Sequence, residues 1–237
     1  MKKVKFIFII MVLPLILMIS CNKETEDEAP EYISPTERSV IVNIPSGLQT
    51  KAEDGDMNAL MATVYMGLAN TLSGFSGSFK LPSNAQIQNK KSNSYIYNWS
   101  MNNFSYWITY SILPDKYTWT YDYEFPDNPR FTFIYAEENK TAKAGAWMIY
   151  DREEPGLKVW NYQWNINSLN SFIASIKFNV TGNSNEGIFE IVANTDNSGS
   201  FLYKIGLLNK AEILWNANGS GTYKIWDGEV LRTGFWN

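Results

Sequence analysis

Beyond residue 95 the chain alternates between aromatic and polar residues with a period of two. The clearest stretch is KYTWTYDYEF, in which every second residue is aromatic and the residues between are Lys, Thr, Asp and Glu. Its aromatic positions are Tyr117, Trp119, Tyr121, Tyr123 and Phe125. Successive side chains of a β-strand point to opposite faces of a sheet, so this stretch predicts a strand with one apolar and one polar face.

The same alternation returns in VWNYQWNI, where Trp160, Tyr162 and Trp164 alternate with Asn161, Gln163 and Asn165. Further short apolar runs follow it, among them FIASIKFNV, IFEIVA, FLYKIG, EILWNA and TYKIW, with turns rich in Gly, Asn and Asp between them. Short strands separated by such turns predict a mainly β fold, a single antiparallel β-meander. A curved sheet, a sandwich and a half-barrel are all compatible with this pattern.

Two segments near the C-terminus, NTDNSGSFLYKI and NANGSGTYKI, share a turn that leads into an aromatic-Lys-Ile strand. Asp196 and Asn218 hold equivalent places in them, which predicts a hairpin repeat. Asn194, Asp196 and Ser198 also match the first ligand positions of an EF-hand calcium loop, but Ile205 stands where that loop needs its acidic residue. We therefore expect a tight turn there, with no metal and no cofactor.

One segment departs from the period of two. DGDMNALMATVYMGLANTLSGF has apolar residues three and four positions apart, which is the spacing of an amphipathic helix. These residues are Met57, Leu60, Met61, Val64, Tyr65, Leu68 and Leu72. Asp56 can begin such a helix and Gly74 can end it, so we expect a helix over 56–73 whose apolar side packs on the sheet. A first strand is expected at Ser39–Pro45.

The N-terminus has the pattern of a secretory signal. Lys2, Lys3 and Lys5 precede an uncharged apolar run from Phe6 to Ile19. A transmembrane helix needs about 20 apolar residues, whereas this run is shorter, contains Pro14 and is followed by a strongly polar segment. Residues 1–20 are therefore predicted to be a signal peptide.

The single cysteine of the chain, Cys21, directly follows this run. Met18 to Cys21 resembles a bacterial lipobox, in which a small residue precedes the cysteine that is acylated. The alternative is a plain signal peptide that leaves a chance cysteine, although an unpaired thiol in an exported protein calls for an explanation. Residues 21–38 are rich in Glu and Asp, so we expect a lipidated cysteine followed by a disordered acidic tether, with a single all-β domain over 39–237.

An acidic stretch directly after such a cysteine resembles the export signal of surface lipoproteins from Bacteroidota-type bacteria. The strand endings GSGTY and TGFW also resemble those of exported β-meander lipoproteins of this kind that have no assigned activity. The resemblance implies a cell-envelope protein that is held on the outer membrane by its lipid, with surface exposure as one option. An ordinary solvated tether explains the acidic stretch equally well.

Composition excludes several function classes. The chain has 24 acidic and 20 basic residues, which disfavours nucleic-acid binding because phosphate contacts supply most of such affinity. It has no histidine, so Ser-His-Asp and Cys-His nucleophiles and histidine-based zinc sites are excluded. Carboxylate chemistry, a Ser-Lys pair and a calcium site built from oxygens remain. The candidate acids include Asp122, Glu124, Glu137, Glu138, Asp151, Glu153 and Glu154.

The aromatic faces are the candidate binding surfaces. The residues concerned are Trp119, Tyr121, Tyr123, Trp160, Tyr162 and Trp164. If the helix or a second sheet covers these rings they are core, whereas open rings would stack on sugars while neighbouring amides bind the hydroxyls. An apolar ligand under the helix or a partner protein fits as well. We expect a non-enzymatic binder of a glycan or a cell-envelope partner, with a carboxylate-dependent glycoside hydrolase as the alternative.

Overall fold

The computed structural model describes residues 31–35, 42–126, 128–154, 156–179 and 186–237. Residues Tyr32 to Asn237 form one unit, which begins somewhat before the expected domain boundary at residue 39. The expected signal peptide, Cys21 and most of the expected tether lie outside the described residues. Among the residues described, no helix is both long and apolar enough to cross a bilayer.

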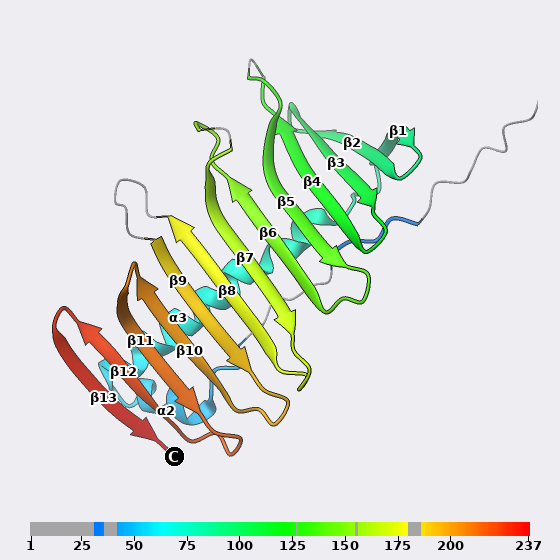
Figure 1. Ribbon diagram of the computed structural model, residues 1–237. Helices are drawn as coiled ribbons and strands as arrows, with labels where there is room; N and C mark the ends of the chain where they lie inside the picture. Colours follow the sequence, from blue (N-terminus) through cyan, green and yellow to red (C-terminus); the bar gives the residue numbers. More distant parts are fainter. Residues whose placement is uncertain (1–30, 36–41, 127, 155, 180–185) are drawn as a thin grey trace, which may run out of the picture. The chain divides into compact units, whose positions relative to one another are not determined.

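The described residues form a 13-stranded antiparallel sheet whose strands neighbour one another in sequence order (Figure 1). The strands are β1 Gln86–Lys91, β2 Ser94–Met101, β3 Phe104–Ile112, β4 Lys116–Glu124, β5 Phe131–Asn139, β6 Ala144–Tyr150, β7 Lys158–Ile166, β8 Phe172–Asn179, β9 Glu186–Ala193, β10 Gly199–Ile205, β11 Leu208–Trp215, β12 Gly221–Asp227 and β13 Val230–Trp236. The mainly β, meandering fold is therefore confirmed. The sheet is open, with β1 and β13 as its edges, and does not close into a barrel.

Within the described ranges, three helical elements precede the sheet: α2 Ser46–Glu53, α3 Met57–Ser73 and the 3₁₀-helix η1 Gly74–Phe79. The expected helix is confirmed as α3, and its predicted cap is present, because the Asp56 side chain accepts hydrogen bonds from the backbone N–H groups of Asn58 and Ala59. Helix α2 was not expected from the sequence. The expected strand at 39–45 is wrong in its described part, since residues 42–45 are not in a strand and the backbone of Val42 bonds the Asn70 side chain instead.

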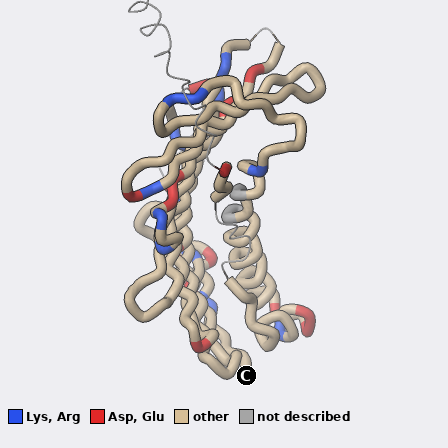
Figure 2. Tube along the Cα trace, turned by 90° about the vertical axis from the view of Figure 1, so that its right-hand side faces the viewer, with Lys and Arg blue, Asp and Glu red and all other residues tan. Residues whose placement is uncertain are grey.

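The helical elements form a layer that crosses one face of the sheet, as Figures 1 and 2 show from two directions. At one end of the layer, Asp56 accepts a hydrogen bond from Tyr223 on β12. In the middle, the ring of Tyr65 on α3 lies 5.0 Å from that of Tyr203 on β10. At the other end, Phe79 of η1 contacts Trp119 on β4. We call the face under this layer the inner face and the opposite one the outer face.

Helix α3 turns three alanines and Met66 toward the sheet. Ala59, Ala62, Met66 and Ala69 are fully buried, whereas the large apolar residues that were expected to pack on the sheet are mostly exposed. The exposed ones are Met57, Leu60, Met61, Val64 and Leu68. The expected orientation is therefore wrong, and the reason is space. The inner face already carries large rings, so three alanines and the flexible side chain of Met66 fit between the helix and the sheet.

The inner face carries the alternating aromatic residues of β4 and β7, as the alternation predicted. Trp119, Ile134, Ile176, Phe189 and Phe201 are fully buried there. Tyr32 joins this core from the N-terminal side, since its hydroxyl donates to the carbonyl of Phe79 at 2.6 Å and its ring packs edge-on against Tyr110. The described end of the expected tether, residues 32–35, therefore packs as part of the domain.

The two echoing segments form equivalent turns. The backbone N–H of Ser198 bonds the Asp196 side chain, and that of Ser220 bonds the Asn218 side chain. The indole of the next inward-facing tryptophan then reaches each turn: Trp215 donates to the carbonyl of Asn197, and Trp236 to that of Gly219. The hairpin repeat predicted from the sequence is present.

Candidate functional site

Four neighbouring strands place a row of side chains on the outer face. Glu137 on β5 lies opposite Ala146 on β6, Ala146 lies opposite Gln163 on β7, and Gln163 lies opposite Ser175 on β8. Because neighbouring strands are about 4.8 Å apart, Glu137 and Gln163 flank the small Ala146 at a separation of roughly 10 Å. The outer surface is therefore recessed at Ala146 on β6, between the longer side chains on β5 and β7.

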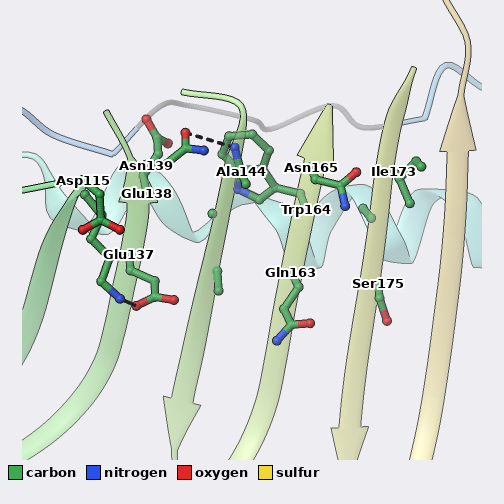
Figure 3. A pocket seen from close by; sticks show the side chains of 14 residues that line it. Asp115, Glu137, Glu138, Asn139, Ala144, Gln163, Trp164, Asn165, Ile173 and Ser175 are labelled. Atoms are coloured by element: carbon green, nitrogen blue, oxygen red, sulfur yellow. Dashed lines mark hydrogen bonds and ion pairs between the residues drawn. The ribbon is translucent and has the colours of Figure 1, made fainter. Parts of the chain in front are cut away.

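This difference in side-chain size produces a depression of about 410 Å³, which we call the trough (Figure 3). Ala144 and Ala146 form its floor, Lys116 and Glu137 stand on one side, and the other side is formed by Gln163, Asn165, Ile173 and Ser175. A volume of this size lies within the usual range for small-ligand sites. The alanines of β6 are thus what opens the sheet surface to a ligand.

One side of the trough is held in place by a charged network. Lys116 Nζ donates to Glu137 Oε2 at 2.8 Å, and the hydroxyl of Tyr135 donates to the same oxygen at 3.1 Å. The hydrogen bond and the charge of Glu137 raise the pKa of Lys116. Burial, and then the charge of Glu137, raise the pKa of Tyr135 to about 12. At neutral pH both groups therefore keep their protons and donate them to one carboxylate.

On the other side of the trough, three polar side chains form no hydrogen bond with the rest of the described protein. Within the described part of the chain, no hydrogen bond uses the side-chain amides of Gln163 and Asn165 or the hydroxyl of Ser175. Amides offer both donors and acceptors, and a hydroxyl offers one donor and two lone pairs. These three side chains are available to a polar ligand without breaking any contact within the described protein.

The predicted ligand-binding aromatics lie on the inner face, and among them Trp164 also lines the trough (Figure 3). Trp119, Tyr162 and Trp164 are buried, with exposed fractions of 0%, 4% and 4%. Tyr121 and Trp160 are partly buried and pack against the core. Tyr123 is half-buried among Phe125, Phe131 and Phe133. The amides that the sequence placed beside these rings, Gln163 and Asn165, point to the opposite face of the sheet.

The candidate acids are spread over both faces and over the turns. Asp122 is bound by Arg130 and Thr132, and Asp151 caps its own turn through the N–H groups of Glu153 and Glu154. Glu137 lies on the outer face, and Glu138 follows it in the same strand and is 9% exposed. Both acids line the trough, where Lys116 already binds Glu137. The described carboxylates do not form a group of three that could hold a metal ion. This arrangement does not favour a hydrolytic pair.

Lys116, Ser175 and the two alanines of β6 line the trough but were not singled out from the sequence, and neither was Tyr135, which bonds Glu137. Tyr135 has the same parity as Phe131 and Phe133, so simple alternation assigns all three to one face. A β-bulge opposite the step from Tyr121 to Asp122 shifts the register and moves Tyr135 to the outer face. A bulge inserts one extra residue and changes the direction of the following side chains, and nothing in the sequence marks its position.

Searches against protein-family models, curated proteins and solved structures gave no match to this chain. The function is therefore inferred from the geometry alone.

Proposed function

We propose that the protein binds a carbohydrate in the trough on its outer face and does not transform it. The observation that carries this proposal is the convergence of three unengaged polar side chains, Gln163, Asn165 and Ser175, on one depression of about 410 Å³. Amide and hydroxyl groups of this kind suit the alternating donors and acceptors of sugar hydroxyls.

The charged side of the trough adds to this fit. Lys116, Glu137 and Tyr135 hold one another in fixed positions, so few rotamers are lost when a ligand binds. The Glu137 carboxylate retains lone pairs that can accept hydrogen bonds from sugar hydroxyls. A glycoside hydrolase is the weaker candidate, because the Glu137 carboxylate is engaged by a cation and Glu138, which also lines the trough, is only 9% exposed.

The proposal extends to where the protein acts. Export through residues 1–20 and acylation of Cys21 would hold the domain on the outer membrane, where glycans and envelope proteins are the available partners. Two or more acyl chains anchor a protein stably, since each buried methylene contributes about 0.8 kcal/mol. Metabolic labelling with an alkyne fatty acid tests the anchor: Cys21→Ala should abolish the label.

Calorimetric titration of the full-length protein with a panel of oligosaccharides tests the binding proposal. We expect saturable binding of at least one neutral oligosaccharide. Removing two amides, with Gln163→Ala and Asn165→Ala together, should weaken it about 10-fold or more, because each hydrogen bond contributes about 0.5–1.5 kcal/mol.

A matched control removes the same two residue types elsewhere. Gln88 and Asn89 are exposed on β1, at one edge of the sheet, so changing both to Ala should leave the affinity unchanged. If both double variants lose the same affinity for the oligosaccharide, or if both keep it, the ligand does not bind in the trough.

A further inference from the structure

A second depression, with a volume of about 560 Å³, lies at the opposite end of β5 and β6 from the trough. Tyr135 and Tyr150 line it from the outer face, and Phe125 and Phe131, near the ends of β4 and β5, line it as well. Its walls are aromatic and cationic, and we call it the arginine pocket. The residues that define it are Phe125, Arg130, Phe131, Tyr135, Tyr150 and Arg152. None of the described residues that line it is acidic, although the chain as a whole carries a formal net charge of −4.

The first of its two guanidinium groups is neutralised within the protein. Arg130 lies over the ring of Trp107, 4.5 Å from its centre, and its Nε donates to Asp122 Oδ2 at 2.9 Å. The hydroxyl of Thr132 donates to the other oxygen of the same carboxylate at 2.8 Å. Arg130 therefore shapes the wall and has its charge compensated.

The second guanidinium, that of Arg152, is held in position but not neutralised. It lies 4.5 Å from the centre of the Phe125 ring, and Nη2 donates to Asn128 Oδ1 at 2.8 Å. Within the described residues it forms no ion pair. A guanidinium has five N–H donors in a fixed fork, so Arg152 keeps donors for an anion, and its stacking against Phe125 lowers the entropy that anion binding would cost.

The pocket and the trough lie along the same pair of strands. Tyr135 lines the arginine pocket, and its hydroxyl donates to Glu137, which lines the trough. On the outer face, β6 contributes Tyr150 to the pocket and Ala146 to the trough. A chain-like ligand that follows β5 and β6 would meet both depressions in succession.

We propose that the arginine pocket binds an acidic sugar, of the uronic acid type, in the same glycan whose neutral part occupies the trough. The carboxylate of the sugar would pair with the Arg152 fork, a geometry that favours two parallel hydrogen bonds. The C–H face of the sugar ring would pack on the aromatic wall. This inference rests on the proposed function and specifies the class of glycan.

The test is a calorimetric titration of the full-length protein with two matched oligosaccharides, one containing glucuronate and the other its carboxyl-reduced, neutral form. For the wild-type protein we expect the acidic form to bind about 10- to 100-fold more tightly, since hydrogen bonds to charged groups contribute about 1.5–3 kcal/mol. Arg152→Gln should remove this preference, and Arg152→Lys should restore only part of it.

Arg232→Gln is the matched control, because it removes one cation from an exposed position on β13 and should leave the preference intact. Equal binding of the two sugars to the wild type, or an unchanged preference in a folded Arg152→Gln protein, overturns the inference. If the two sugars bind equally, and Gln163→Ala with Asn165→Ala weakens the binding of the reduced sugar, then the proposed function is kept and the inference about the arginine pocket fails. If only the acidic sugar binds and the amide variant has no effect, the trough assignment fails and the pocket remains. Binding of neither sugar overturns both.

Discussion

The hydroxyl of Tyr223 donates a hydrogen bond of 2.6 Å to Oδ2 of Asp56, across 167 residues of sequence. The other carboxylate oxygen accepts the N–H groups of Asn58 and Ala59 at the start of α3. Lys51 Nζ lies 3.8 Å from Oδ2. One side chain therefore begins the helix and also fastens it to β12.

Replacing Asp56 by Ala should destabilise the fold by about 2 kcal/mol. Loss of an N-cap costs about 0.5–2 kcal/mol, and the Tyr223 hydroxyl would lose its partner as well. Urea unfolding monitored by tryptophan fluorescence measures the effect. Combining Asp56→Ala with Tyr223→Phe in a double-mutant cycle separates the two contributions, and strictly additive losses would show that the pair is not coupled.

The same carboxylate predicts a pH dependence. Burial alone would raise the pKa of Asp56, but the hydrogen bonds from Tyr223, Ala59 and Asn58 outweigh it and lower the pKa below the ordinary value of 3.8. A group whose pKa is lower in the folded state stabilises the fold above its unfolded pKa, and this contribution is lost as the pH falls through the folded value. The stability difference between wild type and Asp56→Asn should therefore be constant near neutral pH and shrink below about pH 4. A difference that grows on acidification would contradict the assignment.

The orientation of α3 can be tested with one residue from each side. Ala62 is fully buried against the sheet, and Val64 is 57% exposed. Ala62→Leu should destabilise the protein by about 1–3 kcal/mol through overpacking, whereas Val64→Ser should change stability by less than about 0.5 kcal/mol. Chemical denaturation of both variants decides the matter, and the reverse order of effects would mean that the large apolar residues face the sheet.

Two glycines should respond to alanine in opposite directions. A Cβ atom at Gly221 would collide with the carbonyl of Leu214 and with the ring of Trp236, whereas at Gly67, within α3, it would meet no other atom. Gly221→Ala should therefore destabilise the fold by about 1–3 kcal/mol. Gly67→Ala should stabilise it by about 0.5–1 kcal/mol, because alanine favours the helix. Thermal unfolding of the two variants should shift the midpoint in opposite directions.

Local patterns were sufficient to predict most of the fold. The alternation around Trp119 identified the inner face of β4, and the Asp56 cap and Gly74 located α3 to within a residue. The face of α3 was not predictable in this way, because it depends on what the sheet presents to the helix. Hydrophobic spacing favours burial of Leu60 and Val64, but Ala59, Ala62, Met66 and Ala69 are the residues that α3 buries, and the tertiary contact prevails.

The candidate site was harder to predict, because it is assembled across strands. Glu137, Ala146, Gln163 and Ser175 are brought together by the register of four strands, and no segment of sequence contains the row. The aromatic residues attracted attention because rings are common in binding sites, yet in this fold most of the chosen rings are core. The small residues of β6 were the better indication, since they create the depression by leaving space.

Chemical-shift mapping by NMR tests the central claim most directly. The full-length protein would be titrated with the tightest-binding oligosaccharide while the backbone amides and the tryptophan indole N–H groups are observed. We expect the largest shifts at Ala146, Gln163 and Ser175, with small ones at the buried indoles of Trp119 and Trp215. Large shifts at those indoles, or shifts confined to β10–β13, would contradict a carbohydrate site in the trough on the outer face.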